Sequence, residues 1–475
     1  MNNDQIVSNT EEPRGKGGIK KYLMYLSILM VSLMGTNLTD FALSVWVLDQ
    51  PEQSVSSFSM IWFFEAIPGV LLAVFIGSFV DRWNKKMIIV YGQVVAGIGS
   101  IILMTLYHLD MLLPWHIMII VGIGSIATTF IYTAFFVSCR AFVSKKELIK
   151  AQGIAAIIFS FIGMGIPILA PVLYKLLGIG NIFLIDFVTF LVPLVAFLVL
   201  KFVKVPQSDE KFSISSDFKL AINFIKERKG VISLMVFSFI FSFLYGAVEV
   251  LFTPLILDFS DEYTLGIVLS VVALGTLLGG MVMSEDRTFK RPVRSMTTIY
   301  FLAGIVYSCL FIEVNAYTVA IIGMLIVFLF AMEGIIDDAF ILTIVPMEIQ
   351  GRITGFVGLM LGGAAPLAFI TSGAMVDFLK GFVEKNPISF LSHLPGTSVT
   401  TAIVIIFAVS GVLIMAISLF FRGSNAVKQL DQLYRTELAK DDIDETEKKE
   451  DAIDNDQNVI DTSKTEVIEE YEEVV

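Results

Sequence analysis

The feature that most constrains this sequence is a series of long apolar segments separated by short polar turns. A hydropathy window of about 19 residues separates twelve of them. Each is long enough to cross a hydrocarbon core of about 30 Å as a helix that rises about 1.5 Å per residue. Only 16% of the residues are charged, whereas soluble domains average about 25%. The sequence therefore predicts an all-α membrane protein with twelve transmembrane helices. The predicted segments are 22–48, 56–80, 87–107, 113–138, 151–174, 179–202, 231–256, 264–284, 296–313, 316–343, 354–379 and 398–421.

The basic residues predict how these helices are oriented. If the N-terminus is cytoplasmic, the external loops contain only Lys175, Lys380 and Lys385, and the other 30 of the 33 basic residues lie on the cytoplasmic side. Such an excess of Lys and Arg is typical of cytoplasmic loops. The polar stretch 1–20 contains acidic residues, unlike a signal peptide, so the first apolar segment is expected to be a retained helix. Both termini are expected in the cytoplasm.

The longest predicted cytoplasmic connection divides the chain into two halves of six helices. It covers residues 203–230 and mixes apolar with basic residues, as in an amphipathic helix that lies at the membrane interface. We therefore expect a cytoplasmic segment 1–21, a first bundle 22–202, this linker, and a second bundle 231–421.

The remaining tail, 422–475, is expected to be mostly disordered. It holds 17 of the 45 acidic residues and 7 of the 33 basic ones, so it accounts for −10 of the net charge of −12. The overall acidity therefore says nothing about a substrate. A short helix at the start of the tail would bury Leu430, Leu433, Tyr434 and Leu438 at helical spacing, and the acid-rich run beyond Lys440 is typical of disorder.

A charged turn between the second and third segments carries the most specific pattern. It reads Gly77-Ser-Phe-Val-Asp81-Arg82-Trp-Asn-Lys85-Lys86, and its charged part returns at 286–291 as Asp-Arg-Thr-Phe-Lys-Arg. The first turn resembles the signature loop of the major facilitator superfamily. Further similarities are Asn37-Leu-Thr-Asp-Phe41-Ala42, Leu184-Ile-Asp186 and Val345-Pro346-x-Glu348-x-x-Gly351-Arg352.

Together these motifs are similar to the drug-exporter branch of that superfamily, which is typified by macrolide-efflux proteins and includes siderophore exporters. The resemblance covers residues 20–421. It implies two pseudo-symmetric six-helix bundles that work by alternating access. One departure concerns the fourth helix, where many drug–proton antiporters carry an arginine and this chain has Gly124.

The charged residues inside the predicted spans are all acids. A carboxylate within the membrane is costly, so it tends to face a cavity or to carry a proton. The resemblance implies that the first, fourth, seventh and tenth helices line a central cavity, and three of these carry acids. Glu333 and Asp337, four residues apart, share one helix face, where like charges repel. Asp186 is interpreted as a structural hydrogen-bonding residue near a helix end. The substrate or proton site is expected to use Asp40, Glu65 and Glu249 in the outer half and Glu333, Asp337 and Asp338 towards the cytoplasm.

The charged turn is expected to act as a gate at the cytoplasmic face. The resemblance implies that Asp81 interacts with the start of the eleventh helix, whose N-terminal dipole favours an anion. This contact would stabilise the outward-facing state. The gating residues are expected to be Gly77, Asp81, Arg82, Lys85 and Lys86.

The favoured function is proton-coupled efflux of amphipathic or cationic drug-like compounds across a bacterial plasma membrane. Export of a siderophore or peptide is an alternative, as is a transporter-like sensor or scaffold that uses the acidic tail. A membrane enzyme is disfavoured, because the three histidines are dispersed and no nucleophile motif stands out. We expect no cofactor, metal or nucleic acid, and a monomer whose partners are a small molecule, protons and the bilayer.

Overall fold

The computed structural model describes residues 18–50, 54–143, 145–202, 214–228, 230–283, 291–346, 349–385 and 395–439. These residues are helical almost throughout, and no strand occurs among them. The repeated charged turn at 286–290, the side chains of Gly77 and Asp81, and the expected disordered tail beyond residue 439 lie outside what the structure describes. The helices are α1 (Gly18–Leu48), α2 (Val55–Arg82), α3 (Lys85–His108), α4 (Pro114–Phe142), α5 (Lys145–Val199), α6 (Ile214–Glu227), α7 (Val231–Phe259), α8 (Glu262–Met283), α9 (Pro292–Cys309), α10 (Ala316–Ile344), α11 (Gln350–Gly362), α12 (Ala364–Lys385) and α13 (Ser398–Gly423).

The predicted all-helical membrane fold is confirmed. Ten helical segments of the described chain are long and apolar enough to cross a membrane. Element α5 contains the fifth and sixth predicted helices, which are separated by the non-helical backbone of Gly178. The positive φ of 73° at this position suits a residue without a Cβ. The eleventh predicted helix is divided into α11 and α12. The count of twelve separate spans stays a prediction.

Polar residues in the turns start several of these helices. The side chain of Asn84, within the charged turn, accepts a hydrogen bond from a backbone N–H at the start of α3, and Asn315 does the same for α10. Asp261 accepts the backbone N–H of Thr264 at 2.9 Å before α8. The hydrogen bonds from Thr264 hold the pKa of the Asp261 carboxyl below its ordinary value. Each cap satisfies N–H groups that the first helical turn leaves unpaired.

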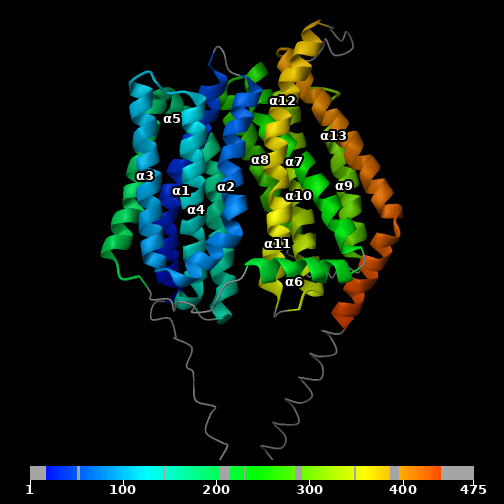
Figure 1. Ribbon diagram of the computed structural model, residues 1–475. Helices are drawn as coiled ribbons and strands as arrows, with labels where there is room; N and C mark the ends of the chain where they lie inside the picture. The colour runs from blue at the N-terminus through cyan, green and yellow to red at the C-terminus, as the bar shows by residue number, and fades with distance from the viewer. Residues whose placement is uncertain are drawn as a thin grey trace, which may run out of the picture.

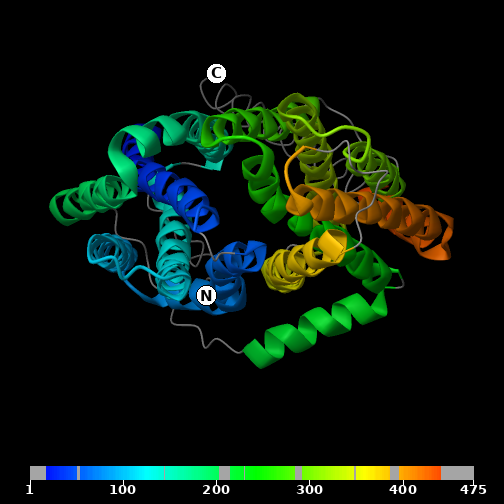
Figure 2. The ribbon, with the colours of Figure 1, turned by 90° about the horizontal axis from the view of Figure 1, so that it is seen from above.

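The helices form two groups that lie side by side (Figures 1 and 2). One group contains α1–α5 and the other α7–α13. Within the first group, α1 and α3 pack on α5 and α2 packs on α4; within the second, α8 packs on α10 and α9 on α13. Helix α6 lies across the end of the molecule at which α1 begins (Figure 1), and it buries Ala221, Phe224 and Ile225.

A short helix at 425–439 follows α13, as the spacing of its apolar residues predicts. Leu430 and Tyr434 are buried, and the Tyr434 ring stacks on Phe340 near the end of α10 with centroids 6.0 Å apart. The Asp431 carboxylate accepts the backbone N–H of Val293 at 3.0 Å. This bond supplies a side-chain cap that α9 lacks locally. The helix therefore belongs to the second bundle.

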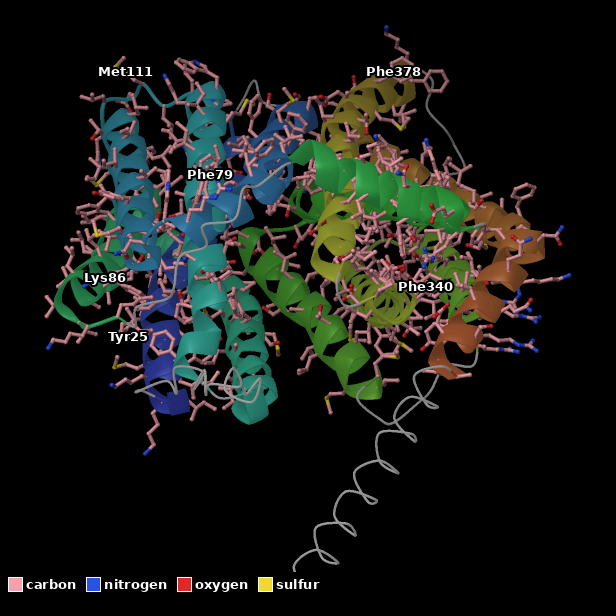
Figure 3. All side chains as sticks on the ribbon, turned by 60° about the horizontal axis from the view of Figure 1, so that its bottom comes forward. Tyr25, Phe79, Lys86, Met111, Phe340 and Phe378 are labelled. Carbon is pink, nitrogen blue, oxygen red and sulfur yellow. The ribbon has the colours of Figure 1, made fainter. Side chains whose placement is uncertain are left out.

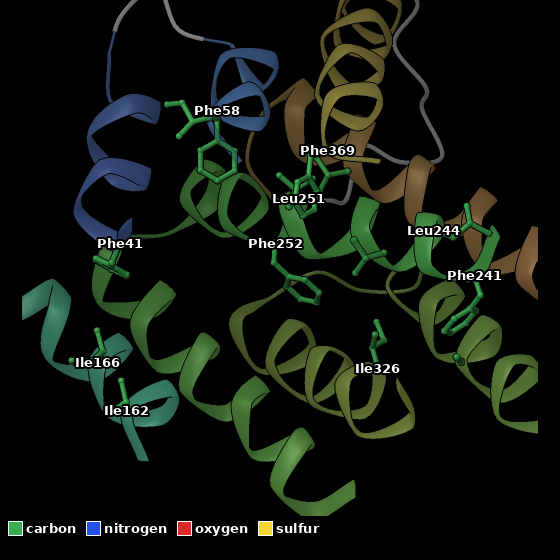
Figure 4. Packing of buried hydrophobic residues seen from close by; sticks show 14 of the residues in the cluster. Phe41, Phe58, Ile162, Ile166, Phe241, Leu244, Leu251, Phe252, Ile326 and Phe369 are labelled. Atoms are coloured by element: carbon green, nitrogen blue, oxygen red, sulfur yellow. The ribbon is translucent and has the colours of Figure 1, made fainter. Parts of the chain in front are cut away.

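The two bundles touch at the end opposite α6, where α2 begins and α12 approaches its own end. The backbone N–H of Ser56 donates to the Asp377 carboxylate at 3.1 Å. A Cβ added at Gly373 would lie 2.7 Å from Ser59 and 2.8 Å from Ser56. Small residues at such a contact let two helices approach closely in a membrane, where packing replaces the hydrophobic effect as the driving force. Beside it, Phe58 and Phe369 belong to an apolar core that continues across both bundles (Figure 4).

Substituting Gly373 should open this end of the molecule. We expect Gly373→Leu to force α2 and α12 apart, because the new side chain has no space beside Ser56 and Ser59. Spin labels at Met111 and Phe378, which are both exposed at this end (Figure 3), should report a longer mean distance than in the unsubstituted protein.

The matched control is Gly381→Leu on the same helix, where an added Cβ meets no atom within 4 Å. An unchanged distance in Gly373→Leu would show that this contact does not hold the end closed.

Candidate functional site

Three carboxylic acids from the two bundles line shared space between them. Asp40 of α1 and Glu65 of α2 come from the first bundle, and Glu249 of α7 comes from the second. All three belong to the walls of two neighbouring cavities, of about 420 Å³ and about 660 Å³. The site therefore depends on how the bundles are placed relative to each other.

The smaller cavity is otherwise largely apolar and aromatic. Trp62, Tyr245 and Phe252 line it, together with a few polar residues that include Asn37. The ring of Tyr245 stacks on Phe330 with centroids 3.8 Å apart, which fixes its orientation. Apolar walls with a few polar groups are typical of sites for small organic molecules.

The walls of these two cavities contain no Lys, Arg or His among the described residues. The three acids therefore have no basic partner in the cavity lining. Carboxylates in such a place attract cations, and in the absence of a cation they tend to hold protons. The same groups can thus bind either species, one in place of the other.

Asp186 lies in the wall of the larger cavity, although the sequence interpretation gave it a structural role near a helix end. Its side chain is buried and accepts a hydrogen bond from the Ser100 hydroxyl at 2.7 Å. It lies eight residues after Gly178, and Asp40 lies eight residues before the end of α1 at Leu48. Both carboxyls therefore lie at a similar depth below the same face of the membrane. This similarity in depth was the signal in the sequence that could have placed Asp186 near Asp40.

Comparison with known proteins places the chain in a family. Residues 25–369 match the family model described as Major Facilitator Superfamily. The chain belongs to the Major Facilitator Superfamily. It is therefore a multi-pass membrane protein of a transporter family, as the charged turn and the apolar segments indicated.

Several superfamily members resemble this chain. Macrolide efflux protein A of Streptococcus pyogenes is 24% identical over 364 residues, which cover 73% of this chain and 87% of that protein. The uncharacterised transporter YkuC of Bacillus subtilis is 26% identical over 294 residues, covering 58% and 67%.

Two solved structures show the same fold. The nucleoside transporter NupG has a TM-score of 0.66 at 16% identity, over 85% of this chain and 100% of that one. A bacterial homologue of the iron transporter ferroportin in its inward-facing state has a TM-score of 0.62 at 13% identity, over 86% and 99%.

The acids of α10 lie apart from the cavity site in this superfamily member. Glu333 is buried, and its carboxylate accepts a hydrogen bond from the Tyr300 hydroxyl of α9. Glu333, Asp337 and Asp338 are absent from the walls of the two cavities, and Asp338 is exposed. The structure thus brings Asp40, Glu65 and Glu249 together and holds Glu333 inside the second bundle. Sequence reasoning missed Tyr300 as its partner.

The signature turn of the superfamily has a packing role in the described part of its sequence. The Lys86 ammonium donates to the carbonyl oxygens of Leu198 and Leu200 at 3.2 and 3.1 Å. A cation is favourable at these carbonyls, which end α5. Lys85 is buried and Arg82 is exposed. The gating role of this turn stays a prediction, since it depends on Asp81.

The bond to Glu333 should be needed for stability. We expect Tyr300→Phe to lower the free energy of unfolding by about 1–3 kcal/mol, because a buried carboxyl loses its donor. The melting temperature of the purified protein in detergent would fall accordingly.

Tyr307→Phe is the matched control. Tyr307 lies seven residues after Tyr300 on α9, which is about two helical turns. It is equally buried, and its hydroxyl has no hydrogen-bond partner among the described residues. Equal melting temperatures for the two variants would contradict a stabilising role for the Tyr300–Glu333 bond.

Proposed function

We propose that this transporter exports amphipathic cationic compounds of drug-like size in exchange for protons. The observation that carries the proposal is the convergence of Asp40, Glu65 and Glu249 on an aromatic-lined space, whose walls contain no basic residue in the described part of the chain. An anionic substrate such as a siderophore would favour a cation in the cavity, so it fits these walls less well. The similarity to macrolide efflux proteins supports a substrate of this class.

In the proposed exchange, the substrate cation and the protons compete for the same carboxyl groups. A cation bound at Glu249 or Asp40 displaces a proton, and a proton that returns from outside displaces the cation. A one-for-one exchange of a proton for a monovalent cation moves no net charge, so the pH difference across the membrane drives it. Each pH unit supplies about 1.36 kcal/mol, which can move the cation outward against its gradient.

The basic residues support an orientation with both termini in the cytoplasm, and we propose that the protein acts as a monomer in a bacterial plasma membrane. In that orientation, the contact of Ser56 with Asp377 closes the extracellular side. We propose that Asp81 contacts the start of α11 in the outward-facing state.

Neutralising the cavity acids should reduce proton-driven export. We expect Asp40→Asn and Glu249→Gln each to lower the export rate about ten- to hundredfold, if a charged contact is worth about 1.5–3 kcal/mol. The measurement is transport of erythromycin, a macrolide with a basic amine, into proteoliposomes with an imposed pH gradient. Asp337→Asn tests the separate acids of α10 in the same assay.

Asp110→Asn, which changes an exposed acid between α3 and α4, is the control for the loss of a negative charge. Export that is unchanged in both the Asp40 and the Glu249 variants, at matched protein levels, would refute the exchange at these groups.

A further inference from the structure

A third space lies on the membrane-facing side of α3 and α4, outside the acid site. It has a volume of about 590 Å³ and begins at the charged turn with Arg82 and Trp83. Beyond Arg82 and Asn84 its lining side chains are apolar or aromatic, and several are open to the surroundings; Trp83 is 54% exposed and Tyr91 is 63% exposed. Helices α3 and α4 run beside each other here (Figure 1). We call this space the α3–α4 groove.

The α3–α4 groove adjoins the larger cavity. Val95 of α3 and Ile123 of α4 belong to the walls of both. The walls of the 660 Å³ cavity also contain Ile98, which is 51% exposed, and the acids Asp40 and Glu249. The groove and the cavity that holds the acids are therefore neighbours that share two wall residues.

Gly124 lies beside these shared wall residues. It follows Ile123 in α4, lines the larger cavity, and has open space where a side chain would be, with no atom of the described residues within 4 Å of an added Cβ. This is the position at which the sequence lacks the arginine of related antiporters. The absence of a side chain here leaves room for a passage beside Val95 and Ile123.

The depth of the passage suits entry from the bilayer. Val95 lies ten residues after the start of α3 at Lys85, which is about 15 Å along the helix and thus near the middle of a hydrocarbon core of about 30 Å. The part of the groove between the charged turn and Val95 therefore lies in the half of the hydrocarbon core next to the charged turn. Under the proposed orientation, this half is the inner leaflet.

We propose that the exported compound enters the acid site sideways from the inner leaflet, along the α3–α4 groove and past Val95, Ile123 and Gly124. This inference rests on the proposed function for the identity of the compound. The apolar walls accept its hydrophobic body. The carboxylates in the wall of the larger cavity attract its cationic group.

The passage can be tested without knowing the transported compound. In a chain with Cys139→Ser and Cys309→Ser, Gly124→Cys places one thiol in the passage. N-(1-pyrenyl)maleimide, which dissolves in the bilayer, should label this thiol in lipid vesicles. Adding Val95→Trp should slow labelling about tenfold, which corresponds to a barrier raised by about 1.4 kcal/mol.

Val94→Trp is the matched control, because Val94 is also a lipid-facing valine of α3 and lines neither the groove nor the cavity. Equal labelling rates in the Val95→Trp and Val94→Trp chains would overturn the passage. Slower labelling in the Val95→Trp chain alone would support it.

Use of the passage by a substrate is tested with Gly124 unchanged. Val95→Trp should lower erythromycin transport into proteoliposomes about tenfold, and Val94→Trp should leave it unchanged. Unchanged export despite slowed labelling would assign the groove to a membrane lipid and overturn the substrate route. Failure of the proposed function would appear separately, as absence of erythromycin export by the unsubstituted protein.

Discussion

The cost of placing carboxyl groups within a membrane governs the arrangement of this transporter. Each such group costs about 2.5–3.5 kcal/mol at a helix centre on insertion scales, so it must find a hydrogen-bond partner, a cavity or a proton. The environments of the individual acids differ. Glu333 has the hydroxyl of Tyr300, and Asp186 has the hydroxyl of Ser100. Asp40, Glu65 and Glu249 share the space between the bundles.

Under the proposed exchange, this division also separates stability from function. A carboxyl that is paired inside one bundle would keep its environment when the bundles move, so its protonation would not be linked to alternating access. Acids contributed by both bundles would experience a different environment in each state. Asp40 and Glu249 lie on different bundles, and the close contact of Gly373 with Ser59 brings those bundles together. The geometry of the acid site therefore depends on packing at one end of the same interface.

Much of the architecture could be predicted from hydropathy, because helices must satisfy their own backbone groups in lipid. Each predicted segment overlaps a described helix, although several bounds differ, and the helix at 425–439 buries Leu430 and Tyr434 as its spacing indicates. The face that each membrane helix turns inward could not be predicted. Helix α10 is apolar on nearly all sides, and lipid is as apolar as a protein core, so hydrophobic periodicity does not report rotation about the axis. This is why the sequence placed Glu333 with the cavity acids and the structure places it against α9.

If substrate and protons occupy the same carboxyl groups, substrate binding must release protons. The release can be measured with a pH indicator on purified protein in lightly buffered detergent near neutral pH. Erythromycin should release protons from the unsubstituted protein, and combining Asp40→Asn with Glu249→Gln should abolish the release. Erythromycin binding to the unsubstituted protein without any proton release would contradict this shared occupancy.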